Sequence, residues 1–418
     1  MRIAFLSTRI SGSDGVSLEV EKWASILGGS GYEIFYCAGE LADQPNQVLI
    51  PEMHFTHPAI QQVQDLAFGI NDSGPAIIAC IEDIANLLRK KVEQFLDDKH
   101  IDLIIAENIL TIPMNIPLGV AVTQIIKERN LPALAHHHDF YWERERFLKC
   151  NVPGILEEFF PPSLPTLAHI VISSLAREML EKRKGIEAEI IPNIFNFREN
   201  SMASKYSVHE IRSMLGIRSD EIMVLQPTRI IPRKGIEHAI DLVAELRKPS
   251  CLEKLSGRPS KLVISHPSGD EGDEYLTMLT RKAQDLGVPM VLADQVFRKD
   301  STTSMEYLWD IYRSADLVTY PSSVEGFGNA LLEAIYFHKP IVINRYPVYD
   351  ADIRPLGFEL FEMAGDVTEN LVESVIAVLN DPERIKEISE NNFQIAKNHF
   401  SYEVVKPKLD KMIGNVLK

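Results

Sequence analysis

The stretch that decides the fold is Thr319-Tyr-Pro-Ser-Ser-Val-Glu325-Gly-Phe-Gly-Asn-Ala-Leu-Leu-Glu333. An apolar run over 317–320 predicts a buried strand, and the apolar spacing from Asn329 onward predicts a helix. Between them, Gly326 and Gly328 let the backbone approach a ligand closely, and the free N–H groups at the helix start attract phosphate. The stretch therefore predicts a strand, a phosphate-binding loop and a helix.

Strands and helices alternate in the same way along both halves of the chain. Apolar strand runs are predicted at 2–7, 101–106, 133–136, 169–173, 223–226, 262–265, 289–293 and 317–320. Runs with helical spacing lie between them at 16–27, 120–129, 235–247 and 274–286. This alternation predicts an α/β fold with doubly wound parallel sheets.

The length and one break in the pattern indicate the domain organisation. At 418 residues, the chain exceeds what one hydrophobic core usually organises. The alternation changes near Ile190, and a polar stretch over 200–209 follows. We therefore expect an N-terminal domain over 1–197 and a second α/β domain over 198–398. The last segment, 399–418, has helical spacing and is expected to pack back on the first domain.

Composition and charge exclude several classes of function. Acidic residues outnumber basic ones by 59 to 43, and the resulting net charge of -16 disfavours a nucleic-acid partner. The four widely spaced cysteines predict free thiols in a reducing compartment. The N-terminus shows no signal-peptide pattern, and the longest apolar region, 103–126, contains polar residues unsuited to a bilayer. We expect a cytoplasmic protein without a membrane span; peripheral membrane association and the oligomeric state stay open.

Two carboxylates flank the predicted phosphate-binding loop. Because Glu325 and Glu333 would repel phosphate, their expected partners are hydroxyl groups, of a sugar ring for one and of a ribose for the other. A molecule with hydroxyls on both sides of a diphosphate is a nucleotide sugar. The alternative is structural: Glu333 favours the dipole of its helix, and Glu325 caps a loop.

A second segment, which is basic, strengthens the nucleotide-sugar hypothesis. The predicted strand 223–226 leads into a loop that carries Arg229 and Lys234. A guanidinium and an ammonium at a strand end can bind a diphosphate and neutralise the charge that grows on it as a glycosidic bond breaks. The alternative is two solvated basic residues on a loop.

These residues together resemble a known family. Arg229 with Lys234, the spacing from Glu325 to Glu333, and the two α/β halves closely resemble the retaining GT-B glycosyltransferases of family 4. The segments Ser265–Tyr275 and Val342–Tyr349 look like the nucleoside-diphosphate-glucose trehalose synthase branch. The resemblance implies two Rossmann-like domains that face each other across a cleft, the first for the acceptor and the second for the nucleotide sugar.

The resemblance also implies roles for individual residues. Arg229 and Lys234 would hold the donor phosphates, Glu325 would contact sugar hydroxyls, and Glu333 would contact the ribose. The remaining expected donor contacts are Gly15, Gly326, Phe327, Gly328 and Asn329. In the first-domain loop, Asp14 stands where the family has a glycine. That replacement puts one N–H contribution to phosphate binding in doubt.

A histidine-rich segment, Ala135–Phe147, follows a predicted strand of the first domain. Three consecutive histidines suggest a metal site, but successive strand residues point to opposite faces, so all three cannot easily converge. We expect no metal. The resemblance implies that a histidine here faces the reacting sugar, which selects His137 together with Asp139. His136 or His138 would match if the register shifts by one, and packed or surface histidines are the remaining alternative.

The same segment is expected to bind the acceptor. Its mixed polar and aromatic side chains suit a polyhydroxylated acceptor or one with an anionic group. The expected acceptor contacts are His138, Asp139, Tyr141, Trp142 and Arg144.

The sequence therefore predicts a retaining hexosyltransferase with His137, Arg229, Lys234 and Glu325 as its catalytic residues. The donor is expected to be a UDP-, GDP- or ADP-hexose, with glucose favoured, and the acceptor a small hydroxylated molecule. No cofactor is expected, because cations of the protein take the place of a metal. The alternatives are mannosyl or other hexosyl transfer to a lipid or polysaccharide, a sugar-nucleotide epimerase, and a non-catalytic sugar-binding protein.

Overall fold

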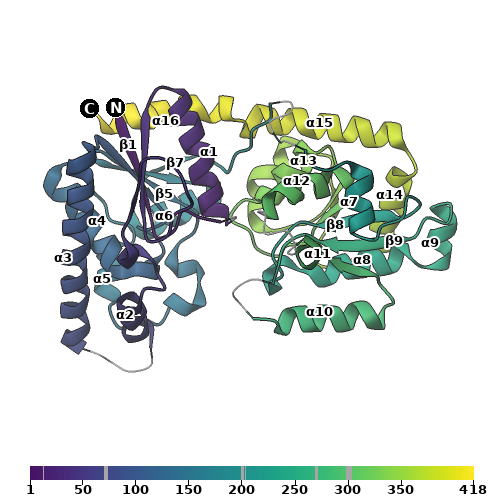
Figure 1. Ribbon diagram of the computed structural model, residues 1–418, viewed down its shortest axis with the longest axis horizontal. Coiled ribbons are helices and arrows are strands. Elements are labelled where there is room, and N and C mark those ends of the chain that lie inside the picture. The colour runs from purple at the N-terminus through teal and green to yellow at the C-terminus, as the bar shows by residue number, and fades with distance from the viewer. Residues whose placement is uncertain (13, 70–73, 199–201, 203, 269–271, 298–303) are drawn as a thin grey trace. The chain divides into compact units, whose positions relative to one another are not determined.

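The computed structural model describes residues 1–418 except 13, 70–73, 199–201, 203, 269–271 and 298–303 (Figure 1). The chain forms two compact units, Met1–Ile194 with Tyr402–Lys418, and Phe195–Ser401. The first break follows Ile194, where 197 was expected, and the chain re-enters the first unit at Tyr402, where 399 was expected. Each unit contains a parallel sheet with helices, so the predicted α/β class is confirmed.

A seven-stranded sheet with the order β3-β2-β1-β4-β5-β6-β7 forms the centre of the first unit. Its strands are β1 (Arg2–Ser7), β2 (Glu33–Ala38), β3 (Gln47–Leu49), β4 (Leu103–Glu107), β5 (Ala133–His137), β6 (Leu167–Val171) and β7 (Ala188–Ile190). All residues of β4 and β5 are buried. This burial explains their continuous apolar runs, because helices cover both faces of a parallel sheet.

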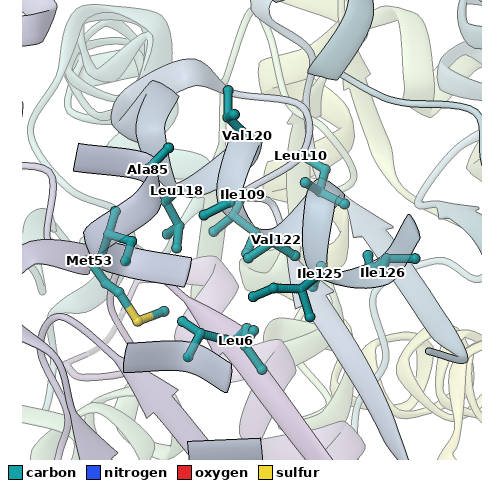
Figure 2. Close-up of a cluster of buried hydrophobic side chains, with 14 of the residues drawn as sticks. Leu6, Met53, Ala85, Ile109, Leu110, Leu118, Val120, Val122, Ile125 and Ile126 are labelled. Atoms are coloured by element: carbon teal, nitrogen blue, oxygen red, sulfur yellow. The ribbon is translucent and has the colours of Figure 1, made fainter. Parts of the chain in front are cut away.

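Most helices of the first unit contribute to two cores that use alternate strand residues, and one helix (Ser174–Lys184) contributes to a third cluster. The helices of this unit are α1 (Gly15–Gly29), α2 (Pro58–Phe68), α3 (Gly74–Lys99), α4 (Ile116–Arg129), α5 (Pro153–Phe159), α6 (Ser174–Lys184) and α16 (Tyr402–Val416). Leu6 belongs to the core with α3 and α4, and Figure 2 shows it near Val122 and Ile125. Phe5 belongs to the other core, with Trp23 of α1 and Leu409 of α16. Consecutive residues of β1 thus serve opposite faces.

The second unit has a six-stranded parallel sheet with the order β10-β9-β8-β11-β12-β13. Its strands are β8 (Ile222–Gln226), β9 (Ser260–Ile264), β10 (Met290–Leu292), β11 (Leu317–Tyr320), β12 (Ile341–Asn344) and β13 (Phe361–Met363). Its helices are α7 (Val208–Met214), α8 (Ile236–Leu246), α9 (Pro249–Lys254), α10 (Glu274–Asp285), α11 (Ala293–Phe297), α12 (Ser304–Ser314), α13 (Asn329–Tyr336), α14 (Glu369–Leu379) and α15 (Pro382–Phe400).

The strand orders locate the ligand-binding edges. In the second sheet, β9 and β10 lie on one side of β8, and β11 to β13 lie on the other. The first sheet has the same arrangement about β1 and β4. Ligands of open α/β sheets bind at the carboxyl ends of the strands where the order reverses in this way. Among the described residues, no helix has the length and apolar content needed to cross a membrane.

Two glycines of the first unit test the packing described above. A Cβ on Gly119 of α4 would lie 2.4 Å from the fully buried Phe160 ring, whereas one on Gly414 of α16 would meet no atom within 4 Å. We expect Gly119→Ala to lower the free energy of unfolding by about 1–3 kcal/mol through overpacking. Gly414→Ala should raise it by about 0.5–1 kcal/mol through helix propensity. Thermal unfolding of both variants checks these two expectations. Equal unfolding midpoints for the two variants would contradict the close packing of Gly119 against Phe160.

Candidate active site

Two loops of the second unit lie side by side because their strands pair. The register of β8 and β11 places Leu225 opposite Val318, so both strands end at the same edge of the sheet. The N–H of Ser323 donates to the carbonyl of Arg233 at 2.9 Å, which joins the loop after β11 to the loop after β8. This edge therefore collects the basic and acidic residues that the sequence analysis treated separately.

A buried ion pair connects the two loops. The Nζ of Lys234 donates to Oε1 of Glu325, and Nη1 of Arg233 lies 3.1 Å from Oε2 of the same carboxylate. Burial by itself would raise the pKa of Glu325, but the adjacent Lys234 and Arg233 cations outweigh burial and hold that pKa below its usual value. Burial also lowers the pKa of Lys234, against the opposing effect of Glu325. Arg233 was missed by the sequence analysis, although its basic side chain precedes Lys234 directly.

Arg229 extends this region toward solvent. Its side chain is exposed, and no hydrogen bond or ion pair involves it within the described parts of the chain. Burial lowers the pKa of the neighbouring His266 to about 4, and the charges of Lys234 and Arg229 act in the same direction. A neutral imidazole thus accompanies the two cations, which leaves a positive region suited to an anion.

The second predicted carboxylate is held by a tyrosine. Glu333 lies in α13 and is buried, and the Oη of Tyr312 donates to its Oε2 at 2.7 Å. Tyr312 lies in α12 and is itself fully buried. Burial raises the pKa of Tyr312, and the Glu333 carboxylate raises it further, so the phenol stays a proton donor. The sequence analysis missed Tyr312, because the pairing of α12 with α13 is not visible in the sequence.

The glycine loop has a backbone conformation that requires glycine. Gly328 has φ +129°, and a Cβ there would lie 2.8 Å from the Oη of Tyr346. That hydroxyl donates to the carbonyl of Phe327 at 2.6 Å. The Tyr346 hydroxyl therefore holds the backbone of the loop, and α13 begins directly after the loop at Asn329. The first N–H groups of α13 lie at a helix N-terminus, where N–H groups have no carbonyl partner within the helix.

In the first unit, the side chains of the three histidines at the end of β5 point to two different faces of the sheet. His137 is buried, and its Nε2 lies 2.9 Å from Nδ1 of His169, whose pKa burial lowers to about 4. His136 and His138 lie on the other side, where both contact the buried carboxylate of Glu107 at the end of β4. The sequence analysis did not single out Glu107 as a site residue. The side chain of His138 is 10% exposed and that of His136 is 1% exposed.

The loop after His138 is organised by Asp139. Its carboxylate pairs with Arg144 and accepts a hydrogen bond from Nδ2 of Asn108 at 3.0 Å. Trp142 is buried and stacks on Phe140 with ring centroids 4.6 Å apart, so little of its surface is available to an acceptor. Tyr141 is half-buried. Asp139 and His138 are half-buried, and the exposed polar side chains of the loop are those of Glu143, Arg144, Glu145 and Arg146.

The divergent Asp14 has a local structural role. It is the N-cap of α1, where its side chain accepts hydrogen bonds from the N–H groups of Val16 and Ser17, and Nη2 of Arg9 lies 3.2 Å from it. Asp14 thus occupies N–H groups that a glycine would leave free. Gly15 follows it as the exposed first residue of α1.

Comparison with known proteins identifies the family. The model of glycosyl transferases group 1 matches residues 207–395. A mannosylglucosylglycerate synthase of Thermotoga maritima is 33% identical over 440 residues, which cover 99% of this chain and 100% of the relative. The chain belongs to the group 1 glycosyltransferases. A synthase of the same name from Petrotoga mobilis is 31% identical over 96% of this chain and 98% of its own length.

Solved structures show the same fold. Sucrose-phosphate synthase from Thermosynechococcus elongatus has a TM-score of 0.70 at 16% identity, covering 100% of this chain and 99% of its own. Anabaena HepE in complex with UDP and glucose has a TM-score of 0.64 at 17% identity, covering 99% of each chain. The predicted GT-B fold is confirmed, as is an enzyme that transfers hexosyl groups. Because the chain is a hexosyltransferase, the epimerase and the non-catalytic sugar-binding protein are no longer alternatives. The trehalose synthase likeness stays a prediction.

The Lys234–Glu325 pair can be tested through stability. In Lys234→Met, the buried Glu325 carboxylate loses the cation that lowers its pKa most and keeps Arg233. We therefore expect a loss of stability toward the range of about 3–5 kcal/mol typical of broken buried pairs. The double variant Lys234→Met/Glu325→Gln should be more stable than Lys234→Met alone. Chemical denaturation of the four proteins that form this cycle measures the coupling.

The pH dependence of these variants has a defined sign. The lowered pKa of Glu325 means that the wild-type pair contributes stability above the ordinary Glu pKa and loses it as the pH falls through the folded value. In Lys234→Met the difference from wild type should therefore be largest near about pH 7 and shrink as the pH falls below about 4.5 and then through the lower pKa of the folded wild-type carboxyl group, where Glu325 becomes protonated. A pH-independent difference would contradict the buried pair.

Proposed function

We propose that this enzyme transfers a hexosyl group, with retention at the anomeric carbon, from a nucleotide diphosphate sugar to a small hydroxylated carboxylate. The observation that carries the donor half is the Lys234–Glu325 pair beside the exposed Arg229, at the edge where β8 and β11 end. The name of the two relatives that span the chain describes a product built from mannose, glucose and glycerate. That name favours mannosyl transfer to a glucosylglycerate-like acceptor over the glucosyl transfer expected from the sequence.

The donor diphosphate is proposed to bind Arg229 and Lys234. When phosphate oxygens approach Lys234, they compete with Glu325 for its ammonium group. The ammonium group then releases Glu325 and binds the diphosphate. The released Glu325 carboxylate then accepts hydrogen bonds from hydroxyls of the donor sugar. Arg233 remains next to Glu325 and limits the cost of this exchange. In this account, the pair keeps two buried charges compensated until the donor arrives.

The nucleoside is proposed to bind Glu333. A ribose hydroxyl would donate to this carboxylate, whose Oε2 also accepts from Tyr312. Backbone groups of Gly326, Phe327 and Gly328, followed by the helix start at Asn329, would line the diphosphate and the sugar. Gly15 stays a proposed donor contact in the first unit.

Retention is proposed to follow a front-face route. As the glycosidic bond breaks, negative charge grows on the leaving diphosphate, and Arg229 and Lys234 stabilise it. The diphosphate oxygen itself would accept the proton of the attacking acceptor hydroxyl. A double displacement would instead require a carboxylate nucleophile within reach of the anomeric carbon, and the proposal assigns Glu325 to hydroxyl binding. The transition state resembles an oxocarbenium ion, as in other glycosyl transfers.

The acceptor is proposed to bind at Asp139 and Arg144. An arginine next to a carboxylate suits an acceptor with both hydroxyls and an anionic group, because Asp139 accepts from hydroxyls and Arg144 binds the anion. His137, predicted to face the sugar, is buried against His169, so its side chain is not proposed to contact substrate. His138 takes that place in the proposal, as the part-exposed histidine of the three.

A donor and acceptor panel tests this function. We expect turnover with a mannose nucleotide and glucosylglycerate, and slower turnover with the matching glucose nucleotide; UDP-, GDP- and ADP-sugars are compared throughout. NMR of the product should show the anomeric configuration of the donor. An inverted linkage would exclude the front-face route, and turnover only with lipid or polysaccharide acceptors would exclude the small carboxylate.

The role of Lys234 has a matched control. Lys234→Ala should lower kcat by about 10²–10³-fold, because it removes a cation from the growing charge of the leaving group. Lys254→Ala removes a lysine that is also ion-paired, with Glu373, but lies in α9 before the start of β9, and it should leave kcat unchanged. Steady-state kinetics with saturating donor measures both. Equal effects of the two substitutions would remove Lys234 from the site.

The role of Arg144 is tested in the same way. Arg144→Ala should raise the acceptor KM by about 10-fold or more and leave the donor KM nearly unchanged, because a charge-assisted contact of about 1.5–3 kcal/mol is lost. Arg129→Ala is the control, since Arg129 also pairs with an aspartate, Asp97, but precedes β5 at the opposite edge of the sheet. Unchanged acceptor kinetics in Arg144→Ala would place the acceptor elsewhere.

A further inference from the structure

A carboxylate and two imidazoles meet at the carboxyl edge of the first sheet. The parallel register of β4 and β5 places Glu107 opposite His136. Alternate residues of a strand share a face, so His136 and His138 approach Glu107 together while His137 turns to His169. The sequence analysis concluded that three consecutive histidines cannot easily converge. Two alternate histidines with a glutamate of the neighbouring strand do converge.

The spacing of these groups suits a transition-metal ion. Nδ1 of His136 lies 3.0 Å and Nε2 of His138 lies 3.4 Å from Oε2 of Glu107. The ligand atoms of the three residues all lie within 4.8 Å of one another. A tetrahedral ion with bonds of about 2.0–2.1 Å separates its ligand atoms by about 3.3 Å. Small side-chain movements would therefore place all three at bonding distance from one ion.

Unpartnered buried atoms beside the cluster are a second, independent observation. Within the described residues, Nε2 of His136 and Oε2 of Glu19 are buried without a hydrogen-bond partner. Glu19 is fully buried in α1, and its charge acts on both His136 and His138. Coordination through Nδ1 of His136 makes Nε2 a proton donor, and Glu19 supplies an unpartnered acceptor in the same neighbourhood. Metal-bound histidines usually donate their second N–H to such a carboxylate.

The ring of His136 is also held in place. The indole of Trp23 stacks on it, with ring centroids 4.0 Å apart and planes inclined by 17°. Trp23 is fully buried in the core of the first unit. A ligand that is fixed by packing loses little side-chain freedom when it binds an ion. The site is thus built on two strands and a packed ring, and not on mobile surface side chains.

We propose that Glu107, His136 and His138 bind a divalent first-row transition-metal ion. Two imidazoles and one carboxylate favour ions such as Zn²⁺ and Co²⁺ over Mg²⁺ and Ca²⁺, which prefer oxygen ligands. Three protein ligands leave at least one position for water or another oxygen ligand. This proposal does not rest on the proposed hexosyl transfer, because it concerns binding of the ion alone.

Titration of the untagged full-length chain, stripped with a chelator, tests the proposal. Zn²⁺ or Co²⁺ alone should bind with one equivalent per chain by calorimetry and raise the midpoint of thermal unfolding, whereas Mg²⁺ should do neither. Bound Co²⁺ should give the visible absorption of nitrogen and oxygen coordination. Absence of saturable binding, or equal binding of Mg²⁺, would overturn the proposal.

Variants connect the binding to these residues. Glu107→Gln, which keeps the shape of the side chain, and His138→Asn, at the part-exposed position, should each weaken Zn²⁺ binding by about 10–100-fold or more. His137→Asn is the matched control: it alters the adjacent histidine on the other face and should keep one equivalent of Zn²⁺ if folded. Circular dichroism establishes folding of each variant. Unchanged affinity in both folded ligand variants, or the same loss in His137→Asn, would assign the ion to another place.

Discussion

The parallel pairing of β8 with β11 is the constraint on which the candidate donor site depends. Both strands run in the same direction, so their carboxyl ends meet at one edge and bring Lys234 within hydrogen-bond reach of Glu325. The two loops are then joined by an ion pair. Burial of either charge without its partner would be strongly destabilising. Arg229 stays exposed at the same edge. One backbone pairing thus sets the charge distribution of the whole region.

Glu333 and the glycine loop are supported by tyrosines that play no direct part in the proposed chemistry. The hydroxyl of Tyr312 donates to one oxygen of Glu333, and the hydroxyl of Tyr346 donates to the carbonyl of Phe327 in the glycine loop. Both tyrosines are buried, so their hydroxyls satisfy polar groups that would otherwise be unpaired. Such support limits the conformations of the loop before a ligand binds, which lowers the entropic cost of binding.

The first unit applies the same sheet geometry to different chemistry. Its edge carries Glu107 with His136 and His138 on one side of β5, and His137 with His169 on the other. The alternation of side chains along a strand therefore divides one histidine run into two environments. The loop that follows has a paired Asp139 and Arg144, which is the arrangement expected for an acceptor with both hydroxyl and anionic groups.

The sequence by itself determined the α/β class, because period and spacing are local properties of a chain. It also predicted Arg229, Lys234, Glu325 and Glu333 as site residues. Only the tertiary structure decided their partners. Arg233, Tyr312 and Glu107 became candidate site residues through contacts with side chains far away in the sequence. It also separated His137 from its neighbours and buried Trp142. Such contacts depend on strand order and helix packing, which a linear pattern does not encode.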